Sequence, residues 1–130
     1  MSVWHGGSHK KKLTGGRKRA HRKKRKFERG AFPTETILGK RKLKKSRRRG
    51  GNVKIRALSE RQASISNPTT GKTENTEIIR VVNNPANIDY DRRGVITKGT
   101  IIETKLGLAR VISRPGQHGL INAVLLPKEQ

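Results

Sequence analysis

Residues 94–113, GVITKGTIIETKLGLARVIS, hold three short runs of β-branched and aliphatic residues divided by turn signals. The runs cover 94–98, 99–104 and 108–113, and a Lys-Leu-Gly turn separates the last two. Because β-branched residues favour strands and glycine between such runs favours turns, this stretch predicts consecutive short strands with tight connections.

The same pattern extends to both sides of this stretch. Residues 53–57 (VKIRA) alternate apolar and cationic side chains, 76–83 (TEIIRVVN) are rich in β-branched residues, and 120–126 (LINAVLL) are mostly apolar. Residues 59–66 are the most ambiguous segment. Several short strands at even spacing predict an all-β fold, a small antiparallel barrel or sandwich, and closure into a barrel would also remove exposed strand edges.

The charge is concentrated in the first part of the chain. The 130 residues carry 32 Lys or Arg against 9 Asp or Glu, a net charge of +23, and residues 1–50 hold 20 of these cations and only Glu28 and Glu35 as acids. With so few apolar residues this part cannot offset the entropy of ordering, so we expect a basic N-terminal extension over 1–50 that a partner orders, followed by a small β-barrel domain over 51–130. If phosphates neutralise its cations, a short helix near 21–29 is expected, with Gly30 as its C-cap.

Composition excludes several classes of protein. Only 30% of the residues are hydrophobic, which argues against a single core that spans the whole chain. The absence of cysteine excludes a disulfide scaffold, and no apolar run approaches the length of a membrane-spanning helix. The first twelve residues contain no apolar region of the kind found in a secretory signal. A sequence pI near 11.7 instead indicates a polyanionic partner, with nucleic acid before an anionic membrane.

Motifs that resemble catalytic or metal sites are incomplete. Thr70-Gly71-Lys72-Thr73 resembles the end of a phosphate-binding loop, but Ser66 stands where that motif needs its first glycine, so a hairpin turn is expected. Ser113 and His118 flank a tight turn at Pro115-Gly116, and His5 and His9 have no third ligand nearby. We therefore predict no enzyme, no catalytic residues, no cofactor and no metal.

The aromatic residues leave the kind of nucleic acid open. Trp4 can stack on an unpaired base or be a loose terminal side chain, and Phe27 can anchor on the barrel or insert beside a nucleotide. A DNA-compacting protein is the second hypothesis. A membrane-active protein is the third, although the basic segment lacks an amphipathic apolar face.

Five strings occur in a fixed order along the chain: Trp4-His5, 13–16 (LTGG), 21–30 (HRKKRKFERG), 49–58 (RGGNVKIRAL) and 113–119 (SRPGQHG). Together they closely resemble small-subunit ribosomal protein eight of the archaeal and eukaryotic type, the S-eight-e family. The resemblance covers nearly the whole chain, and the short length is similar to that of the archaeal form. The chain departs from the family pattern at Lys40, where proline is usual, at Ser59, where arginine is common, and at Ala123, where glycine is usual.

The resemblance implies a structural constituent of the small ribosomal subunit in the cytoplasm, with no catalysis. A β-barrel-like body would sit on the subunit surface while the N-terminal arm threads into small-subunit rRNA, supporting assembly and translation. The implied partners are small-subunit rRNA and neighbouring small-subunit ribosomal proteins, with no membrane and no small-molecule substrate. The predicted RNA-binding residues are Trp4, His5, Lys10, Lys11, Lys12, Thr14, Gly15, Gly16, Arg17, Lys18, Arg19, His21, Arg22, Lys23, Lys24, Arg25, Lys26, Arg29, Lys40, Arg41, Lys42, Lys44, Lys45, Arg47, Arg48, Arg49, Gly50, Gly51, Asn52, Lys54, Arg56, Arg114 and Gln117.

Overall fold

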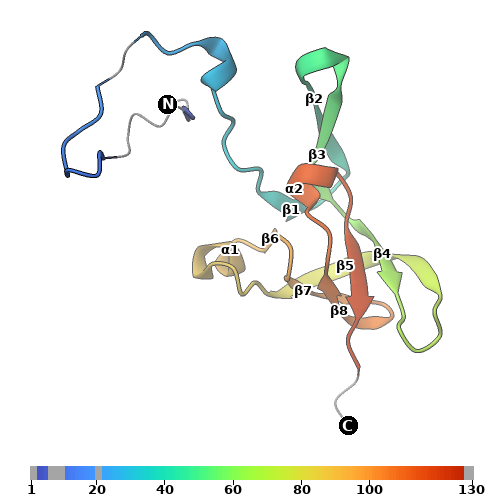
Figure 1. Cartoon of the computed structure of the whole chain (residues 1–130). Coiled ribbons are helices and arrows are strands. Elements are labelled where there is room, and N and C mark those ends of the chain that lie inside the picture. The colour runs from blue at the N-terminus through green and yellow to red at the C-terminus, as the bar shows by residue number, and fades with distance from the viewer. Residues whose placement is uncertain (1–2, 6–10, 20–21, 128–130) are drawn as a thin grey trace. The chain divides into compact units, whose positions relative to one another are not determined.

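The computed structural model describes residues 3–5, 11–19 and 22–127 (Figure 1). The chain divides into two compact units, an N-terminal unit of residues 1–33 and a main unit of residues 34–130. This division lies at Pro33, well before the boundary at residue 50 that the charge distribution predicts. No helix in the described part of the chain is long and apolar enough to span a membrane.

The main unit contains a closed barrel of five strands in the order β4-β5-β7-β8-β9. The strands are β4 (Gln62–Ser66), β5 (Thr73–Asn83), β7 (Ile101–Thr104), β8 (Gly107–Val111) and β9 (Asn122–Leu125). Four neighbouring pairs are antiparallel, and a parallel pairing of β4 with β9 closes the barrel. The predicted all-β fold is confirmed, and the parallel pair is the one feature that an antiparallel barrel does not include.

The barrel interior follows the period of two that its strands predict. On β8, Ala109 and Val111 are 0% and 1% exposed while Leu108 and Arg110 point outward. Ile65 on β4, Ile78 on β5 and Ile102 on β7 complete the same core, together with smaller apolar side chains. At about 0.8 kcal/mol per buried methylene, these side chains hold the barrel strands in their register.

A second sheet has the order β2-β3-β1-β6 and incorporates part of the predicted extension. Its strands are β1 (Thr36–Leu38), β2 (Lys42–Arg47), β3 (Val53–Glu60) and β6 (Val95–Ile96). β1 runs parallel to β3, and the buried Thr36 hydroxyl donates to the Ala57 carbonyl oxygen at 2.8 Å. β3 leads into β4 with a single residue between them, so the ambiguous segment 59–66 is the junction between the sheet and the barrel.

The helices are short, and one of them lies within residues 21–29. The helix expected near 21–29 when phosphates neutralise its cations stays a prediction: among the described residues of that segment only Lys26–Glu28 form a single 3-10 turn, η1, and Gly30 has no left-handed conformation. The neighbouring cations repel one another at helical spacing, which leaves residues 22–25 non-helical. The remaining helices are η2 (Arg49–Gly51), α1 (Ile88–Arg92) and α2 (Pro115–His118).

Several side chains that resemble catalytic groups have structural roles. The loop of residues 67–72 is a hairpin turn, as predicted, with the Asn67 N–H donating to the Lys72 carbonyl oxygen at 2.9 Å. The Ser113 hydroxyl donates to the Leu120 carbonyl oxygen at 3.0 Å and accepts from the Asn122 N–H at 2.9 Å. Since that hydroxyl already has two partners, it holds the segment before β9 in place.

Candidate nucleic-acid interface

The N-terminal unit contains a small turn at the predicted Thr-Gly-Gly string. Lys11 and Arg17 form an isolated antiparallel bridge, and the Lys12 N–H donates to the Gly16 carbonyl oxygen at 2.8 Å. Every residue of 11–19 is exposed. The turn therefore presents its cations and backbone groups to solvent, as a phosphate-contacting loop requires.

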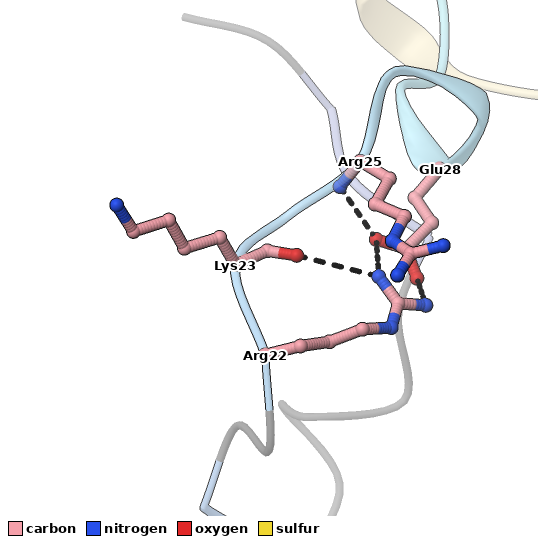
Figure 2. A network of polar contacts seen from close by, with 4 residues as sticks. All are labelled: Arg22, Lys23, Arg25 and Glu28. Atoms are coloured by element: carbon pink, nitrogen blue, oxygen red, sulfur yellow. Dashed lines mark hydrogen bonds and ion pairs between the residues drawn. The ribbon is translucent and has the colours of Figure 1, made fainter.

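A network around Glu28 orders the basic run 22–26 beside the 3-10 turn η1 (Figure 2). The Arg22 guanidinium donates to both Glu28 carboxylate oxygens at 2.5 and 3.1 Å, and the Arg25 N–H donates to Glu28 Oε2 at 3.0 Å. The hydrogen bond from Arg22, followed by that from the Arg25 backbone, lowers the pKa of Glu28 below its ordinary value. One acidic residue thus fixes the backbone here, while the side chains of residues 23–26 stay exposed.

Two aromatic side chains of the N-terminal unit, Trp4 and Phe27, each face a cation. Lys24 Nζ lies 5.5 Å from the centre of the Trp4 ring, and the Arg22 guanidinium carbon lies 5.6 Å from that of Phe27. Trp4 also pairs with Arg29 in an isolated antiparallel bridge, and Phe27 is 75% exposed. Each aromatic ring therefore already makes a cation–π contact, which a stacked base would have to extend or replace.

In the main unit, β2 and β3 form a hairpin with cations facing cations. We call β2, β3 and the loop of residues 48–52 the basic hairpin. Lys44 lies directly opposite Arg56, and Ser46 lies opposite Lys54 on the same face. Among the described residues, none of these three cations forms an ion pair with a carboxylate, and the buried Nε of Arg56 has no hydrogen-bond partner. Facing like charges destabilise a sheet, so this face suits an external polyanion.

The tip of the basic hairpin adds three consecutive exposed arginines, Arg47, Arg48 and Arg49. Gly50 and Gly51 follow with φ of 72° and 78°, a region that other residues rarely adopt, and the Asn52 side chain donates to the Arg49 carbonyl oxygen at 3.0 Å. The hairpin extends away from the barrel in Figure 1, with η2 at its end. This shape presents a compact group of guanidinium groups, which can bind phosphates bidentately.

The predicted Arg-Pro-Gly-Gln turn forms α2 and packs beside β3. A Cβ added to Gly119, which has φ of 76°, would lie 2.8 Å from Ile55 Cγ2. A Cβ added to Gly116 would lie 2.9 Å from the Thr34 carbonyl oxygen. These close approaches bring the exposed Arg114 and half-buried Gln117 to the base of the basic hairpin, so two of the predicted site segments that are far apart in sequence meet in the fold.

The predicted residues fall into groups of different character. Lys10 and His21 lie outside the described residues, as does His9 of the histidine pair. Within the described part, Arg22 and Arg41 are the predicted cations that form ion pairs, the latter with Glu60 at 3.3 Å. The basic hairpin and α2 come together in the main unit, whereas Trp4 to Arg29 belong to the N-terminal unit.

Sequence reasoning missed four further exposed cations, Lys72, Arg92, Lys98 and Arg110. None of them forms an ion pair within the described part of the chain. They lie outside the basic runs of the first 50 residues, and only their position on the folded surface distinguishes them from the ion-paired Arg61, Arg80 and Arg93.

Comparison with known proteins identifies the family. The family model described as ribosomal protein S8e matches residues 5–126. The chain belongs to the ribosomal protein S8e family. Its relatives include proteins named small ribosomal subunit protein eS8 from Ignicoccus hospitalis, 47% identical over 99% of this chain and 100% of the relative, and from Hyperthermus butylicus, 51% identical over 98% and 95%. A relative of the same name from Nanoarchaeum equitans is 50% identical over 81% of this chain and 83% of its own length.

Family membership confirms the resemblance drawn from the five sequence strings, and it places the chain among structural ribosomal proteins, which are not a class of enzymes. Two positions that depart from the expected S8e pattern contact each other, because the Ser59 hydroxyl donates to the Lys40 carbonyl oxygen at 2.5 Å. The third, Ala123, is 0% exposed in the barrel core.

Proposed function

We propose that this S8e-family chain is a structural component of the small ribosomal subunit and binds small-subunit rRNA through its basic surfaces. The N-terminal unit, the basic hairpin and the adjacent α2 supply the contacts. In this role the chain supports subunit assembly and translation in the cytoplasm, next to other small-subunit proteins. Family membership and the names of the relatives support the ribosomal role.

The observation that carries the rRNA-binding proposal is the cross-strand pairing of Lys44 with Arg56. A folded domain gains nothing from placing two cations opposite each other on neighbouring strands, and the carboxylate of the hairpin, Glu60, forms its ion pair with Arg41 instead. A phosphate backbone resolves this repulsion, because each neutralised phosphate also releases condensed counterions. The arginines at the hairpin tip extend the same cationic surface.

The experiment compares two triple variants that lose the same charge. Arg47, Arg48 and Arg49 are changed to Gln at the hairpin tip, and in the control Arg61, Arg80 and Lys105 are changed to Gln on the barrel. The barrel cations are matched in number, but each one already faces Glu77 or Glu103. Binding to a small-subunit rRNA transcript is measured by filter binding at several salt concentrations.

The tip variant should lower the slope of log K against log salt by up to about 2–3, whereas the barrel variant should leave it nearly unchanged. Equal losses for both variants would mean that net charge alone drives binding, and the proposed interface would be wrong. If duplex DNA of equal length bound as tightly as the transcript, the DNA-compacting hypothesis would replace an rRNA role.

A further inference from the structure

The outer side of β8 carries apolar side chains around a single cation. Because side chains alternate along a strand, Leu108, Arg110 and Ile112 share the outward side while Ala109 and Val111 enter the core. Leu108 is 46% exposed and Ile112 is 50% exposed. Two large aliphatic side chains therefore face solvent on either side of one arginine.

Neighbouring strands extend this apolar surface. Arg110 lies opposite Ile101 on β7 and opposite Val124 on β9, and both are half-buried. The Leu126 N–H donates to the Leu108 carbonyl oxygen at 2.8 Å, which places Leu126 beside β8 as well. We call the six residues Ile101, Leu108, Arg110, Ile112, Val124 and Leu126 the outer barrel face.

The border of the outer barrel face is polar, and its groups already have partners. On the β5 side, Arg80 forms an ion pair with Glu103. On the β4 side, the Ser64 hydroxyl donates to the Asn75 side chain at 2.6 Å, and Ser66 is hydrogen-bonded to Thr73 at 3.1 Å. At the centre, Arg110 forms no ion pair with any carboxylate that the structure describes. An apolar centre with a polar rim and an arginine is typical of a protein–protein interface.

We propose that the outer barrel face is a docking surface for another protein of the small subunit. The partner presents apolar side chains around one carboxylate, which meets Arg110. Charge complementarity selects this occupant, because a lone guanidinium among aliphatic side chains needs one opposite charge in an apolar setting. The inference rests on the proposed ribosomal role, since the partner belongs to the same particle.

Two other occupants fit the surface less well. If RNA bound here, several phosphates would lie against aliphatic side chains, and only one cation, Arg110, could neutralise them. The basic hairpin offers many cations instead. A second copy of this chain in a two-fold contact would bring the centre of the face against itself. Two Arg110 guanidinium groups would then meet in an apolar interface.

The test places a photo-crosslinking amino acid at Leu108 in the full chain, and at Arg48 in a second version. Tagged protein is expressed in cells, small subunits are purified on sucrose gradients, and the crosslinked species are separated into protein and rRNA products. The version with the probe at Leu108 is repeated with Arg110→Glu and, as a matched control, with Lys72→Glu in the exposed β4–β5 loop.

The proposal expects the Leu108 probe to crosslink to a different ribosomal protein at a peptide containing Asp or Glu. Arg110→Glu should reduce this product about tenfold or more, and Lys72→Glu should not change it. Three outcomes would overturn the docking surface. The Leu108 probe could crosslink to rRNA, it could crosslink to a second copy of the chain, or it could give no crosslinked product although the chain is present in the subunits. Each of these would leave the ribosomal role intact if Arg48 crosslinks to rRNA. Absence of the chain from small-subunit fractions would instead overturn the ribosomal role and the docking surface together.

Discussion

Removing one of the two facing cations on the basic hairpin should make the free protein more stable and its rRNA binding weaker. Lys44→Gln leaves Arg56 without a facing cation, and Arg56→Met also removes the buried Nε that lacks a partner. Methionine retains an unbranched apolar chain in place of the arginine stem. Opposite effects on stability and binding are expected only if the cations serve an external polyanion.

The magnitudes follow from the two contacts. Relieving a like-charge pair across two strands should raise the free energy of unfolding by about 0.2–1 kcal/mol for Lys44→Gln. A buried donor without a partner costs about 1–3 kcal/mol. Arg56→Met removes this donor as well as the repulsion, so it should raise the free energy of unfolding by that further amount. Each variant should also lower the salt slope of rRNA binding by up to about 0.7–0.9, the value of one phosphate contact.

Urea unfolding at low salt measures the stabilities, and Lys45→Gln is the matched control. Lys45 is on the same strand, but it lies opposite Ile55 instead of a cation. Its loss should leave the free energy of unfolding unchanged within about 0.5 kcal/mol, the usual range for surface substitutions. Near 1 M salt, the gain from Lys44→Gln should shrink because the repulsion is screened. An Arg56→Met variant less stable than the parent, or equal gains from Lys44→Gln and Lys45→Gln, would refute the reasoning.

Three further outcomes can be measured on the purified protein. Gly119→Ala should lower the free energy of unfolding in urea by about 2–4 kcal/mol, because φ is 76° and the new Cβ would lie 2.8 Å from a methyl group on β3, and an unchanged midpoint would contradict that packing. Because Arg22 lowers the pKa of Glu28, their contact should be complete above the ordinary carboxyl pKa and disappear as the pH falls through the lowered value; a carboxyl NMR titration with an ordinary midpoint would contradict the network. A chain beginning at Thr34 should show the far-UV circular dichroism and cooperative melting of a β protein, and one beginning at Gly51, which keeps the five barrel strands but lacks β1 and β2, should melt at a lower temperature; equal melting temperatures would contradict a stabilising role of the second sheet.

The position of most strands could be predicted from local sequence. The β-branched run at 76–83 lies within β5, and the runs at 99–104 and 108–113 contain β7 and most of β8. In these segments the alternation of apolar and polar side chains agrees with the final burial, as Val111 and Arg110 illustrate. Turn residues between the runs then limit each strand to a few residues.

The location of β1 and β2 could not be predicted, because β1 is only three residues long and β2 has a charged composition. β2 reads KLKKSR, with Leu43 as its one apolar residue, so its composition indicates a solvated charged segment. It becomes a strand because β3 offers a free edge, and the exposed lysines tolerate pairing that is independent of side-chain type. This is why the structure divides the chain at Pro33 and not at the point where the charge density falls.

The sequence by itself determined the class of the protein: a basic chain with an all-β domain, and a family signature spread over five short strings. Those properties depend on composition, on the period of side chains along each strand and on residue order, all of which are local. The tertiary structure decided which charges face each other. Lys44 meets Arg56, and α2 packs beside β3, only because strands distant in sequence pair in one register. Arg110 likewise stands alone among aliphatic side chains because three strands of the barrel bring Ile101 and Val124 to its sides.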